Sequence, residues 1–309
     1  MAFYSHDPGM GQRLVDLVRA LELEGRPGLS QQLSITWLRY SEPLGQRLER
    51  VGREPQPPLQ PRGASWEGRR LHYPASVVKL VYLVAAEAWL QQGLLEDGAE
   101  LRRALADMIR DSSNDATGLV VDLLSGTSSG PDLPPDRLEA WASQRQLVNA
   151  WLQQLRWPEL EGCNACQKTW GDGPYGRERQ FYGEDLGNRN RLSSEATARM
   201  LQAVLAGELL SPPACLRMAG LLARSLDPQQ RAADPENQVD GFVGGGLPLE
   251  ARLWSKAGWM SQARHDAAYV EADGADPFLL VIYASGSLNA RDENLLPYLA
   301  GQLLQACRR

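Results

Sequence analysis

The chain contains very little lysine. Of its 32 lysine and arginine residues, only Lys79, Lys168 and Lys256 are lysines, and arginine fills the other positions. A general bias in composition is enough to explain this low ratio of lysine to arginine. The two side chains nevertheless differ, because a buried lysine can lose its proton at working pH and arginine cannot. The three lysines are therefore candidates for positions that need a titratable amine.

The sequence also lacks the features expected of proteins that bind nucleic acid or span a membrane. The formal net charge is -6 and the basic residues form no cluster, which argues against nucleic acid and anionic membrane surfaces as partners. No apolar run approaches the length of a membrane span. The first seven residues contain neither a basic nor an apolar segment, so no signal peptide is visible. We expect a cytoplasmic protein, or a periplasmic one if a leader has been removed.

Cysteine and histidine are scarce, with four and three residues. Cys163 and Cys166 form a C-x-x-C pair, but no second pair or neighbouring histidine completes a zinc site. We therefore expect ordinary thiols, no metal and no cofactor, and a redox or metal role for this pair is the less favoured interpretation. At 309 residues and 43% hydrophobic composition, the chain can bury a core in one large domain or in two lobes.

Ser76 and Lys79 lie three residues apart at the start of an apolar stretch. Residues 80–90 carry one charge, Glu87, and no glycine or proline, which predicts a buried helix that begins near Ser76. Positions i and i+3 share a helix face, so the hydroxyl and the amine are expected to be neighbours. An amine that accepts the serine proton activates a weak nucleophile, and the N–H groups of a helix N-terminus suit a developing oxyanion. A serine three residues before a lysine is by itself a weak signal.

The remaining chain alternates between strand and helix signals. Amphipathic periodicity predicts a helix over residues 12–23, and β-branched and aromatic residues predict a strand over 33–40. Residues 41–70 are polar and proline-rich, so we expect a loop that contains at most a second strand. Further helices are expected at 76–93, 98–110, 115–124, 137–155, 193–206, 211–225 and 289–307. Three strands are expected at 252–255, 265–271 and 278–284.

This order of elements predicts an α+β fold. The most economical arrangement is an antiparallel sheet built from both ends of the chain and flanked by the terminal helices, with an all-helical lobe inserted. The expected lobes are residues 1–75 with 236–309, and residues 76–235, with the active site at their junction. Residues 157–192 are irregular and polar and contain six glycines, and so long a loop is usually functional or mobile.

Three short motifs occur at separate places in the chain. They are Ser76-Val-Val-Lys79, Ser112-Ser-Asn114 and Lys256-Ala-Gly258. Their order and type resemble the S-x-x-K, S-D-N and K-T-G motifs of class A β-lactamases and penicillin-binding enzymes. The surroundings of the motifs are also similar to that family, and the resemblance covers roughly residues 30–309. Three motifs in order, each in a fitting structural context, are far more specific than any one of them.

The resemblance implies an acyl-transfer site. It implies that Ser76 is the acylated nucleophile, that Lys79 is its proton partner and that Ser112 passes a proton to the leaving nitrogen. Lys256 supplies positive charge beside Ser112 and the substrate carboxylate. Acyl transfer needs such a nucleophile, base and acid, together with fixed donors where negative charge develops.

The resemblance also implies a set of substrate-binding residues. Asn114 binds the side-chain amide of the substrate, and Gly258 belongs to the strand motif that lines the site. The backbone N–H groups of Ser76 and Trp259 form the oxyanion hole. Ala257 stands where the family has serine or threonine, so a hydroxyl that contacts a substrate carboxylate is missing, and Arg264 is the residue expected to compensate.

Two further departures concern the acids and the second motif. Ser113 stands where the motif has aspartate, so the role of Ser112 can be displaced by one residue. The family's deacylating carboxylate has no clear counterpart, and Glu178 is the candidate that we prefer over Glu184 and Glu159. Without a base for the attacking water, an ester at Ser76 forms and then persists.

Other interpretations remain open. Ser112 and Asn114 are typical helix-capping residues. A Ser76–His265–Asp266 triad is disfavoured, because adjacent residues of a strand point to opposite faces. We expect a serine hydrolase that opens a β-lactam or a related amide or ester, with a small-molecule substrate and an oligomeric state that the sequence leaves open. A different outcome is a penicillin-binding, DD-peptidase-like or esterase-like enzyme with another substrate, or a binding protein that has lost turnover.

Overall fold

The computed structural model describes the whole chain except residues 1–2 and 55–56. The chain divides into two compact units. Unit 1 comprises Met1–Val77 and Ser193–Arg309, and unit 2 comprises Val78–Leu192. The first unit is therefore built from both ends of the chain, and the second from the segment between them.

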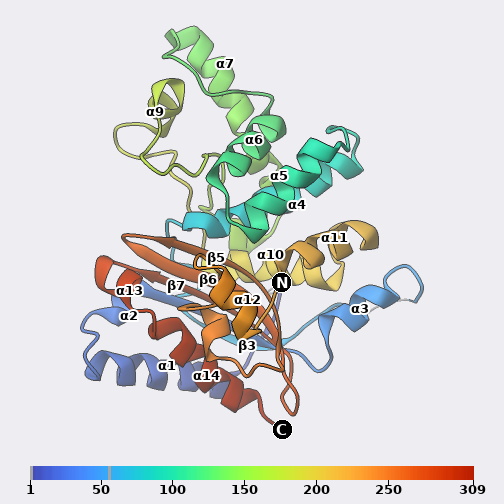
Figure 1. The fold of residues 1–309 in the computed structure, drawn as a ribbon, viewed down its shortest axis with the longest axis vertical. Coiled ribbons are helices and arrows are strands. Elements are labelled where there is room, and N and C mark those ends of the chain that lie inside the picture. Colours follow the sequence, from blue (N-terminus) through green and yellow to red (C-terminus); the bar gives the residue numbers. More distant parts are fainter. Residues whose placement is uncertain (1–2, 55–56) are drawn as a thin grey trace. The chain divides into compact units, whose positions relative to one another are not determined.

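Unit 1 is organised around a seven-stranded sheet (Figure 1). Its strands are β1 (Ser5–His6), β2 (Leu33–Arg39), β3 (Arg62–Trp66), β4 (Ala223–Arg224), β5 (Arg252–Met260), β6 (Ala263–Glu271) and β7 (Phe278–Ser285). Their order is β1-β3-β2-β7-β6-β5-β4, and every pair is antiparallel except β1 with β3. Because β2 pairs with β7, the sheet joins the two ends of the chain, which confirms the predicted α+β class.

Helices cover both faces of this sheet (Figure 1). The α-helices of unit 1 are α1 (Pro8–Leu23), α2 (Leu29–Gln32), α3 (Leu44–Arg50), α10 (Ser194–Ala206), α11 (Pro212–Leu222), α12 (Pro228–Ala233), α13 (Ser287–Arg291) and α14 (Leu295–Cys307). Helices α1 and α14 share one apolar core with the sheet, as the terminal helices were expected to do. Helix α10 contacts β2, β6 and β7.

Strand β2 shows how alternation builds these two layers. Leu33, Ile35 and Trp37 belong to the core that α1 and α14 complete. Ser34 and Thr36 point to the other face, where Thr36 hydrogen-bonds Ser194 at the start of α10. Successive side chains of a strand alternate between faces, so one strand supplies an apolar surface to one layer and a polar anchor to the other.

Unit 2 is helical, as predicted for the insert. It contains α4 (Val78–Gln91), α5 (Ala99–Arg110), α6 (Asn114–Ser125), α7 (Pro135–Arg145), α8 (Leu147–Gln154), α9 (Gly176–Tyr182) and the short 3-10 helix η2 (Pro158–Leu160). Helix α4 packs against α5, α6 and α8 and is buried over most of its length. Its apolar sequence, with no glycine or proline, explains why it forms the centre of this unit.

Residues 193–235 group with the sheet, whereas the sequence analysis assigned them to the helical lobe. Helix α10 explains the difference. Thr197 shares a hydrogen bond of 2.7 Å with Tyr283 of β7, and Tyr40 donates to Gln202 at 3.0 Å. Helical periodicity indicates that a segment has a buried face, but it does not show which layer that face packs against.

Several element boundaries also differ from expectation. The helix predicted over 137–155 is two helices that meet at Gln146, and the one predicted over 289–307 is interrupted at Asp292, whose backbone is extended. Helix α3 lies within a segment predicted as loop, and its buried Leu44 and Leu48 lie four residues apart. The second strand allowed in that segment is β3. Within the described residues, no helix has the length and apolar character needed to cross a bilayer.

Candidate active site

The residues predicted for the site belong to both units, and the predicted nucleophile, Ser76, lies in unit 1. Ser76 occupies a 3-10 turn, η1 (Ala75–Val77), which leads directly into α4. The N–H of Val77 donates to the carbonyl of Pro74 at 3.1 Å, and Ala75 has a positive φ of 46°. An alanine in this region is strained by about 1–3 kcal/mol, and such strain is typical of functional turns. Ser76 is partly exposed although Ala75 and Val77 are buried.

Strand β5 lies directly against this turn. A Cβ placed on Gly258 meets the carbonyl oxygen of Pro74 at 2.9 Å, the nitrogen of Ser76 at 2.9 Å and that of Val77 at 3.0 Å. These are backbone atoms, which cannot move aside as the end of a flexible side chain does. The glycine of the third motif is therefore needed because it lets the strand approach the backbone at Ser76.

Replacing Gly258 with alanine is expected to displace the turn and slow any reaction at Ser76 by about tenfold to a hundredfold, because small misplacements of reacting groups are costly. Gly220→Ala is the matched control, since nothing lies within 4 Å of a Cβ at this position. The rate of covalent labelling of Ser76, measured by intact mass, checks the effect. Equal rates for Gly258→Ala and the wild type contradict this account of the glycine.

The edge of β5 next to this turn is open. Lys256 is fully buried, and its Nζ donates to Gln238 Oε1 and, at 2.7 Å, to the carbonyl of Ala257. Gln238 Oε1 also accepts from the N–H of Ala257 at 3.2 Å. In the part of the chain that is described, β4 pairs with β5 only at Leu253 and Trp254. Because backbone groups alternate along a strand, the N–H of Trp259 points to the same open edge as that of Ala257.

The side chains of Trp259 and Arg264 meet on the neighbouring strands. Trp259 pairs with Arg264 in the ladder, and both donate to the carbonyl of Ala290, at 3.0 and 2.9 Å. The remaining guanidinium nitrogens contact Gly241 and Glu293, and Arg264 is only 5% exposed. Arg264 was expected to compensate for the hydroxyl missing at Ala257, and this role stays a prediction. The indole of Trp259 stays 58% exposed.

Unit 2 brings together Lys79, Ser112 and Asn114. The amine of Lys79 donates to the carbonyl of Ser112, to its hydroxyl at 3.1 Å and to Asn114 Oδ1 at 2.9 Å. The residue that caps α6 is Ser113, whose hydroxyl accepts from the N–H of Ala116. The capping interpretation therefore applies to the middle residue of the motif, and the two outer residues face the lysine.

Burial changes the protonation of Lys79. The side chain is 0% exposed, and this desolvation lowers its pKa from 10.5 to about 7. The three oxygens that accept from the amine are neutral, so they stabilise the ammonium form far less than a carboxylate does. A substantial fraction of the lysine is therefore unprotonated at neutral pH and able to accept a proton.

The loop over residues 157–192 reaches α4 one turn from Lys79. Tyr82 donates to the carbonyl of Gln167 at 2.6 Å. The side chain of Asn190 accepts from the N–H groups of Cys166 and Gln167 and donates to the Gln167 carbonyl, so it fixes this part of the loop. The loop residues 162–171 contain no aspartate or glutamate. The segment that packs on this face of α4 therefore brings no carboxylate.

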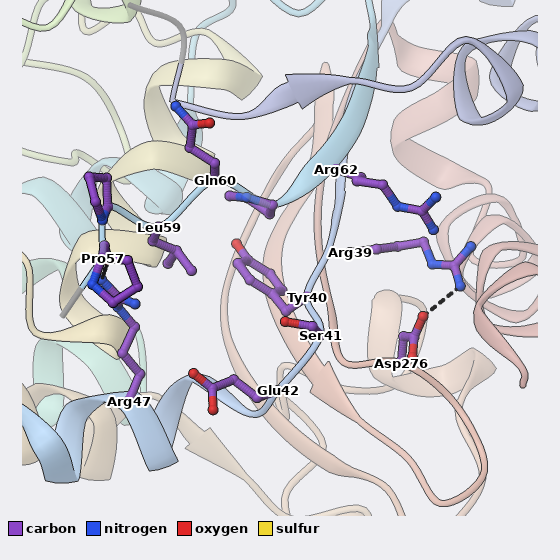
Figure 2. Close-up of a pocket in the computed structure, with 12 residues that line it drawn as sticks. Arg39, Tyr40, Ser41, Glu42, Arg47, Pro57, Leu59, Gln60, Arg62 and Asp276 are labelled. Atoms are coloured by element: carbon purple, nitrogen blue, oxygen red, sulfur yellow. Dashed lines mark hydrogen bonds and ion pairs between the residues drawn. The ribbon is translucent and has the colours of Figure 1, made fainter.

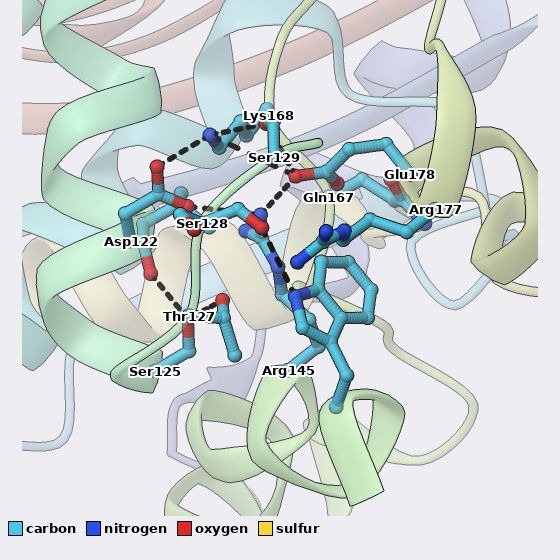
Figure 3. Close-up of polar contacts among 12 residues, drawn as sticks. Asp122, Ser125, Thr127, Ser128, Ser129, Arg145, Gln167, Lys168, Arg177 and Glu178 are labelled. Atoms are coloured by element: carbon cyan, nitrogen blue, oxygen red, sulfur yellow. Dashed lines mark hydrogen bonds and ion pairs between the residues drawn. The ribbon is translucent and has the colours of Figure 1, made fainter. Parts of the chain in front are cut away.

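The acids considered for deacylation lie elsewhere. Glu178, the preferred candidate, is fully buried and pairs with Arg145, and its Oε1 also accepts from Ser129 at 2.8 Å (Figure 3). Lys168 lies 3.7 Å from the same oxygen. Glu159 is buried and Glu184 is exposed. The position of Glu178 in an ion-pair network gives it a structural task and does not favour the expectation that it activates water.

The histidine of the disfavoured triad and the cysteines also have definite places in the fold. His265 donates to the Tyr73 carbonyl, while Asp266 on the opposite face accepts from the N–H of Val243, so the two do not form a dyad. None of the four cysteines, all of which lie in the described part of the chain, forms a disulfide, and burial raises the pKa of Cys166 to about 12. Among the described residues, no group of three or more histidine, cysteine or acidic side chains is arranged to hold a metal.

A separate cavity of about 540 Å³ in unit 1 contains none of the predicted site residues (Figure 2). It lies beside the proline-rich segment after Pro57. Its two acids, Glu42 and Asp276, are paired with Arg50 and Arg39 at 2.5 and 2.7 Å. These pairs neutralise the charges of the two acids.

Sequence comparison relates this chain to one family. A model described as the beta-lactamase enzyme family matches residues 95–306. No curated protein sequence matches the chain.

Gln238, the hydrogen-bond partner of Lys256, was not predicted from the sequence, since a single glutamine in a polar stretch carries no signal.

Solved structures share the fold at low sequence identity. A point mutant of PBP-A, solved as an acyl-enzyme complex with penicillin G, has a TM-score of 0.64 at 16% identity, with 97% of each chain covered. A β-lactamase from Sphaerobacter thermophilus has a TM-score of 0.63 at 17% identity, covering 94% of this chain and 95% of that one. An ancestral class A β-lactamase of Gram-negative bacteria has a TM-score of 0.60 at 17% identity, covering 93% and 98%.

Proposed function

Because this chain belongs to the beta-lactamase enzyme family, we propose that it is a serine hydrolase whose Ser76 attacks a β-lactam or a related amide or ester. The observation that carries the proposal is the environment of Lys79. A fully buried amine with a pKa of about 7, bonded to Ser112 and Asn114, follows Ser76 by three residues. This combination supplies a base, a second hydroxyl and an amide in the order that the motifs imply.

In the proposed reaction, the neutral amine of Lys79 accepts the proton of the Ser76 hydroxyl as the oxygen bonds to the substrate carbonyl carbon. The N–H groups of Ser76 and Trp259 stabilise the resulting oxyanion, and losing one such donor typically costs about 10²–10³ in rate. The carbon–nitrogen bond then breaks, and Ser112 passes a proton to the leaving nitrogen. Lys256 contributes positive charge. Water completes the cycle by hydrolysing the ester on Ser76.

A second candidate function is penicillin binding, in which the ester forms and persists. The observation that favours it concerns the loop over 157–192. Its residues next to α4 carry no acid, and Glu178 is held by Arg145. Without a carboxylate to activate water, hydrolysis of an acyl-enzyme is slow. The two candidates share the first half of the reaction and differ only in the lifetime of the ester.

Incubation with a labelled penicillin and with a simple aryl ester, followed by intact mass, tests the proposal. We expect an adduct on the wild type and none on Ser76→Ala. A wild type that forms no adduct with either compound refutes acyl transfer at Ser76. Loss of the adduct within seconds supports hydrolysis, and persistence for hours supports penicillin binding.

A further inference from the structure

Two buried histidines lie behind the turn that carries Ser76. His265 on β6 is 0% exposed and bonds backbone groups through both ring nitrogens. Its Nδ1 accepts from the N–H of Ala284 at 3.0 Å, so its proton resides on Nε2, which donates to the carbonyl of Tyr73 at 3.0 Å. The tautomer of His265 is therefore set by a backbone donor on one side and a backbone acceptor on the other.

His72 is held by a similar pair of contacts. The Ser34 hydroxyl donates to the carbonyl of Glu67 at 2.8 Å, so it accepts from Nε2 of His72, also at 2.8 Å. Burial lowers the pKa of His72 to about 4, so the ring is neutral at neutral pH and Nδ1 accepts from the hydroxyl of Ser285 at 2.8 Å. Contacts at both ring nitrogens hold His72, like His265, in one orientation.

The ring of Tyr283 packs against both histidines. Its centroid lies 5.4 Å from that of His72 and 4.6 Å from that of His265, and the histidine centroids are 6.2 Å apart. Burial lowers the pKa of His265 to about 3, and the nearby titratable groups that lower it further in each ring are His72 for His265 and Arg70 for His72. The cluster thus forms a rigid, uncharged support.

The support connects to Ser76 through two restrained residues. Tyr73 is followed by Pro74, whose ring fixes φ, and by Ala75, whose positive φ is strained. Between the Tyr73 carbonyl and the Ser76 nitrogen the chain has little freedom, so holding that carbonyl holds the N–H of Ser76. Strained backbone persists only where its surroundings restrain it.

We propose that His265 is the positioning residue of the nucleophile turn: its Nε2–H anchors the Tyr73 carbonyl and so fixes the hydroxyl and the N–H of Ser76 for acyl transfer. This inference rests on the proposed function of Ser76. His265 touches no reacting atom. It acts through Tyr73, and Gly258, its partner in the β5–β6 ladder, brings β5 against the same turn.

Two substitutions separate this task from simple packing. His265→Gln keeps a donor near the Nε2 position, and His265→Asn keeps an acceptor near the Nδ1 position but does not reach Tyr73. We expect Asn to lower the saturating rate of Ser76 acylation by about tenfold to a hundredfold with little change in half-saturating concentration. Gln is expected to stay within about threefold of the wild type, since it retains the contact to Tyr73.

Tyr283→Phe is the matched control. It keeps the ring that packs on both histidines and removes only the hydroxyl, which contacts Thr197. The melting temperature of each variant is measured alongside the rate. A merely structural role lowers stability in all three variants and does not separate Asn from Gln in acylation rate.

Hydrogen exchange of the peptide that covers residues 73–78 gives a readout that needs no activity. We expect faster exchange in the Asn variant, where the hydrogen bond from Val77 to Pro74 loosens, and wild-type exchange in the Gln variant. The inference is overturned if both variants match the wild type in acylation and exchange, or lose both equally. If the wild type is not acylated but the exchange pattern appears, the positioning role stands and the proposed function fails.

Discussion

Replacing Lys79 with arginine is expected to slow acylation of Ser76 by about 10²–10⁴-fold, the usual contribution of a general base. Arginine keeps the positive charge and the donors toward Ser112 and Asn114, but it cannot release its proton at working pH. The substitution therefore removes the base while leaving an electrostatic contribution in place. Stopped-flow or mass-based measurement of the acylation rate under saturating penicillin checks the effect.

Lys168→Arg is the matched control for this substitution. Lys168 belongs to the same unit and pairs with Asp122 at 2.6 Å, an interaction that arginine also makes. We expect its acylation rate to stay within about threefold of the wild type, because ion pairs of this kind need a charge and not a titratable amine. If the acylation rate falls equally in both variants, the size of the arginine side chain explains the effect, and this result contradicts a base role for Lys79.

The pH dependence of the wild type offers a further check on Lys79. A base with a pKa of about 7 is mostly neutral above that pH, so the acylation rate is expected to rise through pH 7 and then level off. Stability follows the same group. The folded pKa lies below the unfolded value of 10.5, so this contribution to the free energy of unfolding is complete above pH 10.5. It is lost as the pH falls from 10.5 to about 7.

Replacing Glu178 with leucine is expected to reduce the free energy of unfolding by up to about 3–5 kcal/mol, because it removes the fully buried one of the two carboxylates that pair with Arg145. Arg145 and Glu178 are each fully buried, and Asp122 lies 3.0 Å from the same guanidinium (Figure 3). Nε and Nη1 of Arg145 are buried and have no hydrogen-bond partner in the described residues. Loss of the Glu178 contact therefore removes one of the few interactions that compensate for burying this charge. Urea denaturation of the variant and the wild type measures the change.

Two companion variants make this prediction specific. Glu184→Gln changes an exposed acid of the same loop and is expected to shift stability by less than about 0.5 kcal/mol. The double variant Arg145→Met with Glu178→Leu is expected to recover much of the loss, since removing both partners of a buried ion pair is often nearly neutral. If Glu178→Leu instead leaves stability unchanged and only prolongs the acyl-enzyme, Glu178 is the deacylating carboxylate that activates water, and its structural assignment is wrong.

The sequence by itself determined the fold class and the main elements. Apolar periodicity and β-branched runs encode local conformation and burial, which is why α4, α6 and the strands of the sheet follow from the pattern. The order of the motifs could also be recognised in the sequence. Lys79 and Lys256 are two of only three lysines, and Lys79 follows Ser76 by three residues. Gly258 could be predicted as a site residue from its position in the third motif alone.

Only the tertiary structure decided how the polar residues are used. Glu178 and Arg264 carry charges that suit a site, yet one pairs with Arg145 and the other bonds the carbonyl of Ala290. His265 supports the Tyr73 carbonyl, and α10 packs on the sheet. The physical reason is that a buried polar group must find a partner, and that partner comes from whichever distant segment the fold brings near, which no local pattern records.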